Sequence, residues 1–225
     1  MKRSEVNMIL KDTIEFLEQR KFYLPPFAFW TSKDWEDKGH EVNEIRDNLL
    51  GWDITDFGRD NFSKFGLVLF TLRNGNDSNP KYVKPYAEKI MIVEESQKTP
   101  MHFHFKKMED IINRGPGNIL LELYNCTDNE RLDKNKPVRV SLDGVIKQFS
   151  PGEIVRLTPG ESISLPKRLY HTFYAEDGKG KVLMGEVSKV NDDKTDNHFL
   201  EPIGRFPEID EDEKALYYLC FEYPK

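Results

Sequence analysis

Two histidines and a glutamate within eight residues carry the clearest chemical signal in this sequence. His102 and His104 are separated by one residue, and Glu109 follows shortly after them. In an extended strand, residues two apart point to the same face, so both imidazoles would point to one place while Phe103 and Phe105 pack on the opposite side. A bend after this strand would return the carboxylate to the two rings. Imidazole nitrogens combined with a carboxylate oxygen are typical ligands of a divalent metal ion.

A third imidazole comes from His171. Pro166 ends one expected strand, and the next strand, residues 170–174, holds His171 on the face opposite to Tyr170 and Tyr174. His171 can therefore supply a fourth contact to the same ion. The alternative is that the paired histidines are ordinary polar residues on a half-exposed strand. We predict a metal site with the ligands His102, His104, Glu109 and His171.

The strands that must position these residues are short and closely spaced. Apolar and β-branched runs follow one another with no helical pattern between them, which is typical of an all-β sandwich or barrel. Asp143 and Gly144 separate two such runs, and this pair is a signal for a tight hairpin. The expected strands are residues 65–72, 89–93, 101–105, 118–124, 138–142, 145–149, 153–157, 162–165, 170–174, 182–187 and 215–221.

The N-terminal part of the chain has a different pattern. From residue 5 to residue 21, apolar side chains recur at helical spacing, and Pro25 and Pro26 end the pattern. The polar face of this helix mixes both signs of charge, so we expect it to pack on the barrel rather than lie on a membrane surface. Residues 27–60 hold all three tryptophans without a strand pattern, and we expect them to wrap the barrel.

The ligand pattern resembles the two-part motif of the cupins, small antiparallel β-barrels that hold a metal by three histidines and one glutamate. The first part is His-x-His-x4-Glu, residues 102–109, and the second runs from Gly160 through Pro166 to His171. The resemblance implies an all-β cupin jelly-roll barrel with an N-terminal helix. Three positions depart from the usual motif without being ligand positions: Ser96, Arg168 and Ala175.

Over essentially its full length, the chain resembles the D-lyxose isomerases within the cupin superfamily, most clearly in residues 1–5, 102–109 and 201–207. This resemblance implies a metal-dependent aldose-ketose isomerase that interconverts D-lyxose and D-xylulose, with D-mannose and D-fructose as a related pair. Nitrogen and oxygen ligands without sulfur are compatible with manganese, cobalt, iron, nickel or zinc. Among these ions, the resemblance favours manganese (Mn2+). We expect one domain, residues 1–225, with a wrapping segment 1–60 and a barrel core 61–225.

The implied reaction needs a sugar bound through O1 and O2 and a carboxylate base that moves a proton from C2 to C1. The resemblance points to Glu201 as this base. The alternative is that Glu201 is an ordinary carboxylate on a surface loop. Lys107 and Lys89 can donate to sugar oxygens, although lysines are commonly solvated surface charges. Arg205 and Asp212 are further candidates for positioning hydroxyls, and Asp212 belongs to an acidic run that is more typical of a solvated loop.

Composition narrows the class of protein. The net charge is −6, with 33 basic and 39 acidic residues mixed along the chain, so no positive field is expected for nucleic acid. No apolar run approaches the length of a membrane span, and the opening residues are polar, so we expect a cytoplasmic protein. Cys126 and Cys220 are far apart, as in a reduced intracellular protein. The resemblance implies a homodimer, with a free monosaccharide as substrate.

Two other functions use the same ligand set. A cupin dioxygenase would bind iron and activate oxygen at the open coordination positions. A sugar-binding or storage cupin would keep a structural metal and turn nothing over. A sugar phosphate isomerase is a further alternative, but the sequence has no concentrated Arg/Lys cluster or glycine-rich anion cradle for a phosphate group.

Overall fold

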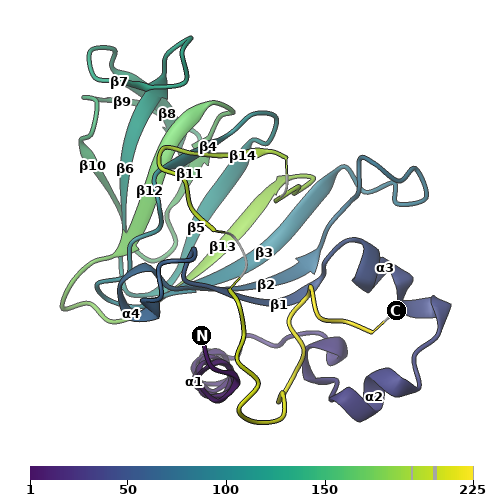
Figure 1. Ribbon diagram of the computed structural model, residues 1–225. Coiled ribbons are helices and arrows are strands. Elements are labelled where there is room, and N and C mark those ends of the chain that lie inside the picture. Colours follow the sequence, from purple (N-terminus) through teal and green to yellow (C-terminus); the bar gives the residue numbers. More distant parts are fainter. Residues whose placement is uncertain (194, 205–206, 225) are drawn as a thin grey trace.

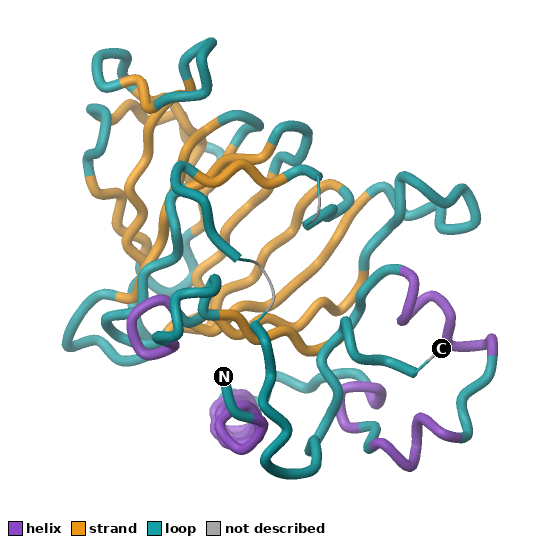
Figure 2. Tube along the Cα trace, viewed as in Figure 1, coloured by secondary structure: helices purple, strands orange, loops and turns teal. Residues whose placement is uncertain are grey.

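Two curled antiparallel sheets face one another and form an open barrel (Figure 1). The computed structural model describes residues 1–193, 195–204 and 207–224. The predicted all-β cupin barrel with an N-terminal helix is confirmed. Strands outnumber helices (Figure 2), and within the described residues no helix begins after Phe62. None of the helices in the described ranges is long and apolar enough to cross a membrane.

The larger sheet contains β1, β2 and β3 at one edge and β8 and β9 at the other, and each strand runs antiparallel to its neighbour. Its strands, in spatial order, are β1 (Gly51–Thr55), β2 (Leu67–Arg73), β3 (Tyr86–Val93), β13 (Val182–Lys189), β5 (Glu109–Pro116), β11 (Ser162–Leu165), β8 (Val138–Leu142) and β9 (Val145–Phe149).

The smaller sheet closes the opposite side of the barrel. Its strands, in spatial order, are β10 (Ile154–Leu157), β6 (Ile119–Cys126), β12 (Leu169–Ala175), β4 (His102–His104) and β14 (Asn197–Phe199), and β7 (Leu132–Asp133) pairs with β6.

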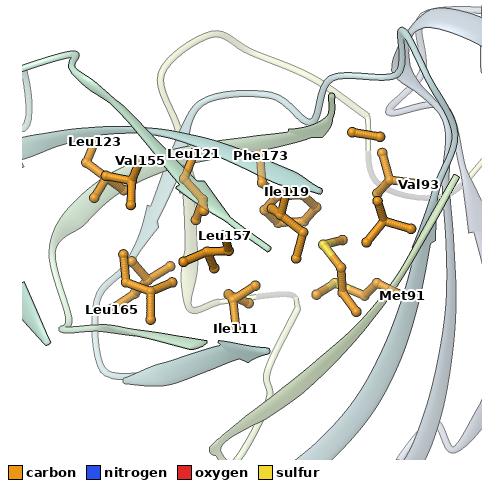
Figure 3. Close-up of a cluster of buried hydrophobic side chains, with 14 of the residues drawn as sticks. Met91, Val93, Ile111, Ile119, Leu121, Leu123, Val155, Leu157, Leu165 and Phe173 are labelled. Carbon is orange, nitrogen blue, oxygen red and sulfur yellow. The ribbon is translucent and has the colours of Figure 1, made fainter. Parts of the chain in front are cut away.

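The main hydrophobic core fills the space between the two sheets (Figure 3). Met91 and Ile111 of the larger sheet pack toward Leu121 and Phe173 of the smaller one, and all four side chains are buried. Alternate residues of each strand supply this core because successive side chains of a strand point to opposite faces. Most inward positions are therefore apolar. The few polar residues at inward positions form the candidate site described below.

A second core lies on the outer face of the larger sheet, under helix α1 (Arg3–Gln19). Val6, Leu10 and Leu17 of the helix pack with Phe70 of β2 and Ile92 of β3. The central strands are thus buried on both faces, which explains their nearly continuous apolar sequences. The remaining helical pieces are η1 (Pro26–Phe29), α2 (Ser32–Glu36), η2 (His40–Val42), α3 (Asn43–Asp47) and α4 (Phe62–Phe65).

The C-terminal segment runs back along α1 and ties both ends of the chain together (Figure 1). Arg3 is only 2 % exposed and forms ion pairs with Glu211, at 2.7 Å, and with Glu222. Residues 215–221 were predicted to form a strand, and this prediction is wrong. Their apolar side chains pack against the outer core, and only an isolated bridge between Trp52 and Leu219 joins them to the sheet.

Two strands of the larger sheet were missed by the sequence patterns. β1 lies within the segment that was expected only to wrap the barrel, and it is short and buried at every position. β5 begins at Glu109 and alternates buried side chains with partly buried or exposed ones, but its buried positions include Glu109 and Asn113. Polar residues at inward positions hide the usual apolar alternation, so β5 gives no strand signal.

Candidate metal centre and active site

His102, His104 and His171 converge on the inner face of the smaller sheet. His171 of β12 pairs directly with His102 of β4, and their ring centroids are 4.2 Å apart. His104 lies two residues further along β4, on the same face, with its ring 5.1 Å from that of His102. The candidate ligand nitrogens of the three residues all lie within 4.8 Å of one another. Phe103 packs on the opposite face against Tyr170, as the strand alternation predicts.

Glu109 reaches these rings from the larger sheet. It is the first residue of β5 and is held between Ser188 of β13 and Leu165 of β11. Its carboxylate oxygens lie 3.0 Å from His171 Nε2 and 3.4 Å from His104 Nε2. The four side chains therefore meet between the two sheets, in the barrel interior, and Glu109 is only 4 % exposed.

The hydrogen bonds of two imidazoles prepare them to bind a cation. His102 Nδ1 lies 2.9 Å from the Pro100 carbonyl oxygen, and His171 Nδ1 lies 3.0 Å from that of Leu169. A carbonyl oxygen only accepts, so each Nδ1 carries the proton and each Nε2 keeps a lone pair. Within the described residues, His171 Nε2 is buried without a hydrogen-bond partner, facing an oxygen of Glu109. A positive ion between these two acceptors fits this arrangement.

Burial and neighbouring charges shift the pKa values of His102, His104 and Glu109. It lowers the pKa of His102 well below its ordinary value, helped by the neighbouring His171, and lowers the pKa of His104, helped by the charge of Lys107. Burial alone would raise the pKa of Glu109, but Lys107 and the surrounding imidazoles outweigh it and hold this pKa well below the usual range. His102 and His104 are therefore neutral imidazoles and Glu109 is an ionised carboxylate, which are the forms that bind metals.

A buried charge network continues from Glu109 along the inner face of the larger sheet. Lys107 Nζ lies 2.7 Å from Glu109 and 2.9 Å from Glu186 of β13, and Lys89 Nζ of β3 lies 3.7 Å from the same oxygen of Glu186. Burial opposes charge on Lys107, yet the two carboxylates raise its pKa above the ordinary value. Burial likewise opposes charge on Glu186, but the two lysines lower its pKa. All four side chains are less than a tenth exposed.

These groups line a cavity of about 60 Å³ in the barrel interior. Its polar lining includes three of the candidate ligands, His102, His104 and Glu109, together with both lysines and Glu186. Apolar side chains such as Met91, Phe173 and Phe199 form its other walls. A cavity with convergent polar groups and shifted pKa values is typical of an active site.

Comparison with known proteins assigns the family. The D-lyxose isomerase family model matches residues 1–223. The chain belongs to the D-lyxose isomerase family. It is 52% identical to the D-lyxose/D-mannose isomerase of Escherichia coli O157:H7 over 224 residues, covering 99% of this chain and 98% of that protein. It is 49% identical to the D-lyxose/D-mannose isomerase of Serratia proteamaculans over the same length and coverage. This member of the family is accordingly a sugar isomerase of the aldose-ketose type.

Solved structures support the fold of the family. The L-ribose isomerase of Cellulomonas parahominis, solved with no ligand, superposes with a TM-score of 0.62 at 16% identity, covering 93% of this chain and 98% of that one. A crystal structure of Geodermatophilus obscurus L-ribose isomerase gives a TM-score of 0.61 at 16% identity and the same coverage. These likenesses concern the cupin-type barrel alone.

The candidate catalytic and substrate residues fall in different places. Lys107 and Lys89 line the cavity beside the candidate ligands. Glu201 is 71% exposed and forms an ion pair at 2.8 Å with Arg59, although Phe199, two residues earlier, lines the cavity. Asp212 lies at the start of α1, where it accepts hydrogen bonds from Ser4 N and Oγ. Arg205 lies outside the described residues.

Sequence reasoning missed Glu186, although a signal for it exists. Residues 182–187 were expected to form a strand, and Val182 and Met184 of β13 belong to the interior core. Glu186 is the next residue with the same parity, so it must also point inward. A lone carboxylate at an inward position of an apolar strand needs a buried partner, and Lys107 is that partner.

Proposed function

We propose that this protein interconverts D-lyxose with D-xylulose, and D-mannose with D-fructose, at a centre where His102, His104, Glu109 and His171 hold a divalent metal ion. The D-lyxose/D-mannose isomerases that match over nearly the full chain support the sugar assignment. The observation that carries the proposal is a cavity where His102, His104 and Glu109 adjoin a Lys107–Glu186–Lys89 charge network, with His171 Nε2 3.0 Å from the Glu109 carboxylate.

The candidate ligands suit manganese, and also cobalt, iron, nickel or zinc, since they offer nitrogen and oxygen without sulfur. The family resemblance favours manganese. A bound divalent ion would polarise the sugar carbonyl and offset negative charge at its oxygen. Lys107 keeps its proton because of the two carboxylates beside it, so it can donate a hydrogen bond to a sugar oxygen in the cavity.

The isomerisation also needs a group that takes the proton from C2 of the aldose and returns it to C1, while the hydroxyl proton of O2 passes to O1. Glu186 suits this task because it lines the cavity, and the positive charges of Lys107 and Lys89 keep it ionised. Glu201, which the family resemblance favours, remains the alternative base. Its loop follows Phe199 at the cavity wall, but its carboxylate pairs with Arg59 at the surface.

The test is a turnover assay with defined metal content. Protein stripped with a chelator and reloaded with manganese should form D-xylulose from D-lyxose and D-fructose from D-mannose, and the stripped protein should form neither. Absence of ketose above a blank containing manganese alone would refute the proposal. Oxygen uptake by iron-loaded protein would instead support the dioxygenase alternative.

The expected homodimer and cytoplasmic location stay predictions. The family resemblance is the support for a homodimer, and light scattering on the purified protein tests it directly. We propose a free, unphosphorylated monosaccharide as the substrate, in keeping with the relatives named for D-lyxose and D-mannose.

A further inference from the structure

A second and larger cavity adjoins the first. It has a volume of about 330 Å³ and shares three lining residues with the cavity at the histidines, namely Leu69, Lys89 and Asp193. These three side chains border both cavities, so the two cavities are neighbours. Leu69 and Thr71 are two residues apart on the inner face of β2, and Leu69 borders both cavities whereas Thr71 borders the second one alone.

The walls of the second cavity are built from buried polar groups. Asn48, Asn74 and Lys89 line it and are each 5 % exposed or less. Asn48 Nδ2 donates to the Asn74 carbonyl at 3.0 Å, and Asn74 Nδ2 donates to the Asn191 carbonyl at 3.0 Å. Asn191 in turn accepts a hydrogen bond from Lys89 through Oδ1, at 2.5 Å. This hydrogen-bonded wall is preformed, and through Lys89 it joins the charge network of the candidate active site.

The volumes of the two cavities indicate that neither the histidine cavity nor its candidate metal site alone can hold a whole sugar. Ligand sites in proteins generally have volumes of about 300 Å³ or more. The histidine cavity, at about 60 Å³, is well below this range, whereas the second cavity, at about 330 Å³, is within it. A five- or six-carbon sugar whose carbonyl end reacts beside the histidines therefore needs another place for its remaining carbons.

We propose that the second cavity binds the polyol tail of the open-chain sugar, from C3 onward, while C1 and C2 react in the histidine cavity. This inference rests on the proposed function and adds the part of the protein that recognises the rest of the substrate. Amide and carboxylate groups suit a row of hydroxyls because they supply both donors and acceptors.

The charged residues of the second cavity bear on which substituents the sugar tail can carry. Among the described residues that line it are the aspartates Asp47, Asp53, Asp77, Asp192 and Asp193, against the single cation Lys89. With five carboxylates and one ammonium group in its lining, the cavity offers few cations to pair with a phosphate on the terminal carbon. We therefore expect uncharged pentoses and hexoses to react faster than phosphorylated sugars.

Thr71 is the position from which the cavity can be filled. It is 7 % exposed, pairs with Lys89 of β3 and Gly51 of β1, and does not line the histidine cavity. Thr71→Ile and Thr71→Phe keep a side chain that favours strands while occupying space in the second cavity. Val145→Phe is the matched control, because it adds a ring to β9, at the far edge of the same sheet, where Val145 is 59% exposed.

The experiment compares substrates of increasing length: D-glyceraldehyde, which lacks a tail, D-lyxose and D-mannose. Filling the cavity should lower kcat/KM for D-mannose at least about tenfold more than for D-glyceraldehyde, with D-lyxose between them. The control variant Val145→Phe should have the same kcat/KM as the parent protein for all three substrates. An equal loss on all three substrates would overturn the proposal, and so would turnover of D-mannose 6-phosphate as fast as that of D-mannose.

A binding measurement separates this inference from the proposed function. D-Arabinitol has the pentose tail but no carbonyl, so it cannot be isomerised. Calorimetric titration should show weaker binding of D-arabinitol to Thr71→Phe and Thr71→Ile than to the parent protein and Val145→Phe. Failure of the parent protein to convert any sugar would refute the proposed function alone. Equal D-arabinitol binding in all four proteins, or binding in none, would refute the tail site.

Discussion

His171 lies directly opposite His102 where β12 pairs with β4, and the two imidazole rings are 4.2 Å apart. Both rings donate through Nδ1 to a backbone carbonyl two residues earlier, at Leu169 and Pro100. The backbone of the smaller sheet thus fixes the spacing of the rings and also the nitrogen that each ring offers. Neighbouring strands supply a prepared half of a metal site, and the larger sheet completes it with Glu109.

Replacing one of these imidazoles should abolish metal binding. His102→Gln removes a nitrogen that the proposed centre needs, so we expect loss of bound manganese, measured by equilibrium dialysis and elemental analysis, together with loss of turnover. His198→Gln is the matched control, because His198 stacks on Phe103 on the other face of β4. Retention of a full equivalent of metal by His102→Gln would contradict the ligand assignment.

Glu186 and Glu201 can be separated as candidate bases. Glu186→Gln should lower kcat about 10²- to 10⁴-fold, the range for loss of a general base, and should slow exchange of the C2 hydrogen with deuterated water to a similar extent. Glu201→Gln should have a much smaller effect, because this carboxylate is exposed and paired with Arg59. The reverse order of the two effects would assign the base to Glu201.

Lys107 should be needed for stability as well as for turnover. Lys107→Met leaves Glu109 and Glu186 buried without their shared cation, and loss of one partner from a buried ion pair typically costs about 3–5 kcal/mol. Urea denaturation of metal-free protein measures this loss. Lys106→Met, an exposed neighbour, serves as the control and should unfold like the parent protein. Unchanged stability of Lys107→Met would show that the network is solvated.

Acid should destabilise the metal-free protein through its buried imidazoles. His102 and His104 have folded-state pKa values below the ordinary 6.5, so the unfolded chain takes up their protons first as the pH falls. Their contribution to the free energy of unfolding is present above about pH 6.5 and is lost as the pH falls toward the folded-state values. Urea denaturation between pH 8 and pH 5 should show this decline, and the double variant His102→Gln/His104→Gln should flatten it. An equal slope in both proteins would contradict the assignment.

The sequence patterns predict the fold where local signals and tertiary packing agree. Helix α1 was expected at residues 5–21 and forms at Arg3–Gln19, and strands β8, β9 and β11 have the expected bounds. β5 was missed because Glu109 and Asn113 occupy inward positions that apolar residues usually take. The strand expected at residues 215–221 is absent, because packing against α1 buries its apolar residues without a partner strand.

The candidate site was predictable to the extent that the position of a residue along a strand determines the face on which its side chain lies. Parity places His102 and His104 on one face of β4, but the meeting with His171 depends on the pairing of β12 with β4, in which His171 lies opposite His102. Parity also identifies Glu186, once Val182 and Met184 are assigned to the core. No such rule applies to Glu201, because the direction of an exposed loop side chain depends on contacts such as the one with Arg59 that local sequence does not encode.

The two-sided burial of β3 links the outer helix to the interior of the barrel. Ile90 and Ile92 pack in the outer core with Leu10 of α1, while Lys89 and Met91, on the alternate face, line the histidine cavity. A change of side-chain volume at Leu10 should therefore alter the wall of the histidine cavity through the thickness of one strand. Helix α1 thus helps to set the width of a cavity that its own side chains do not line.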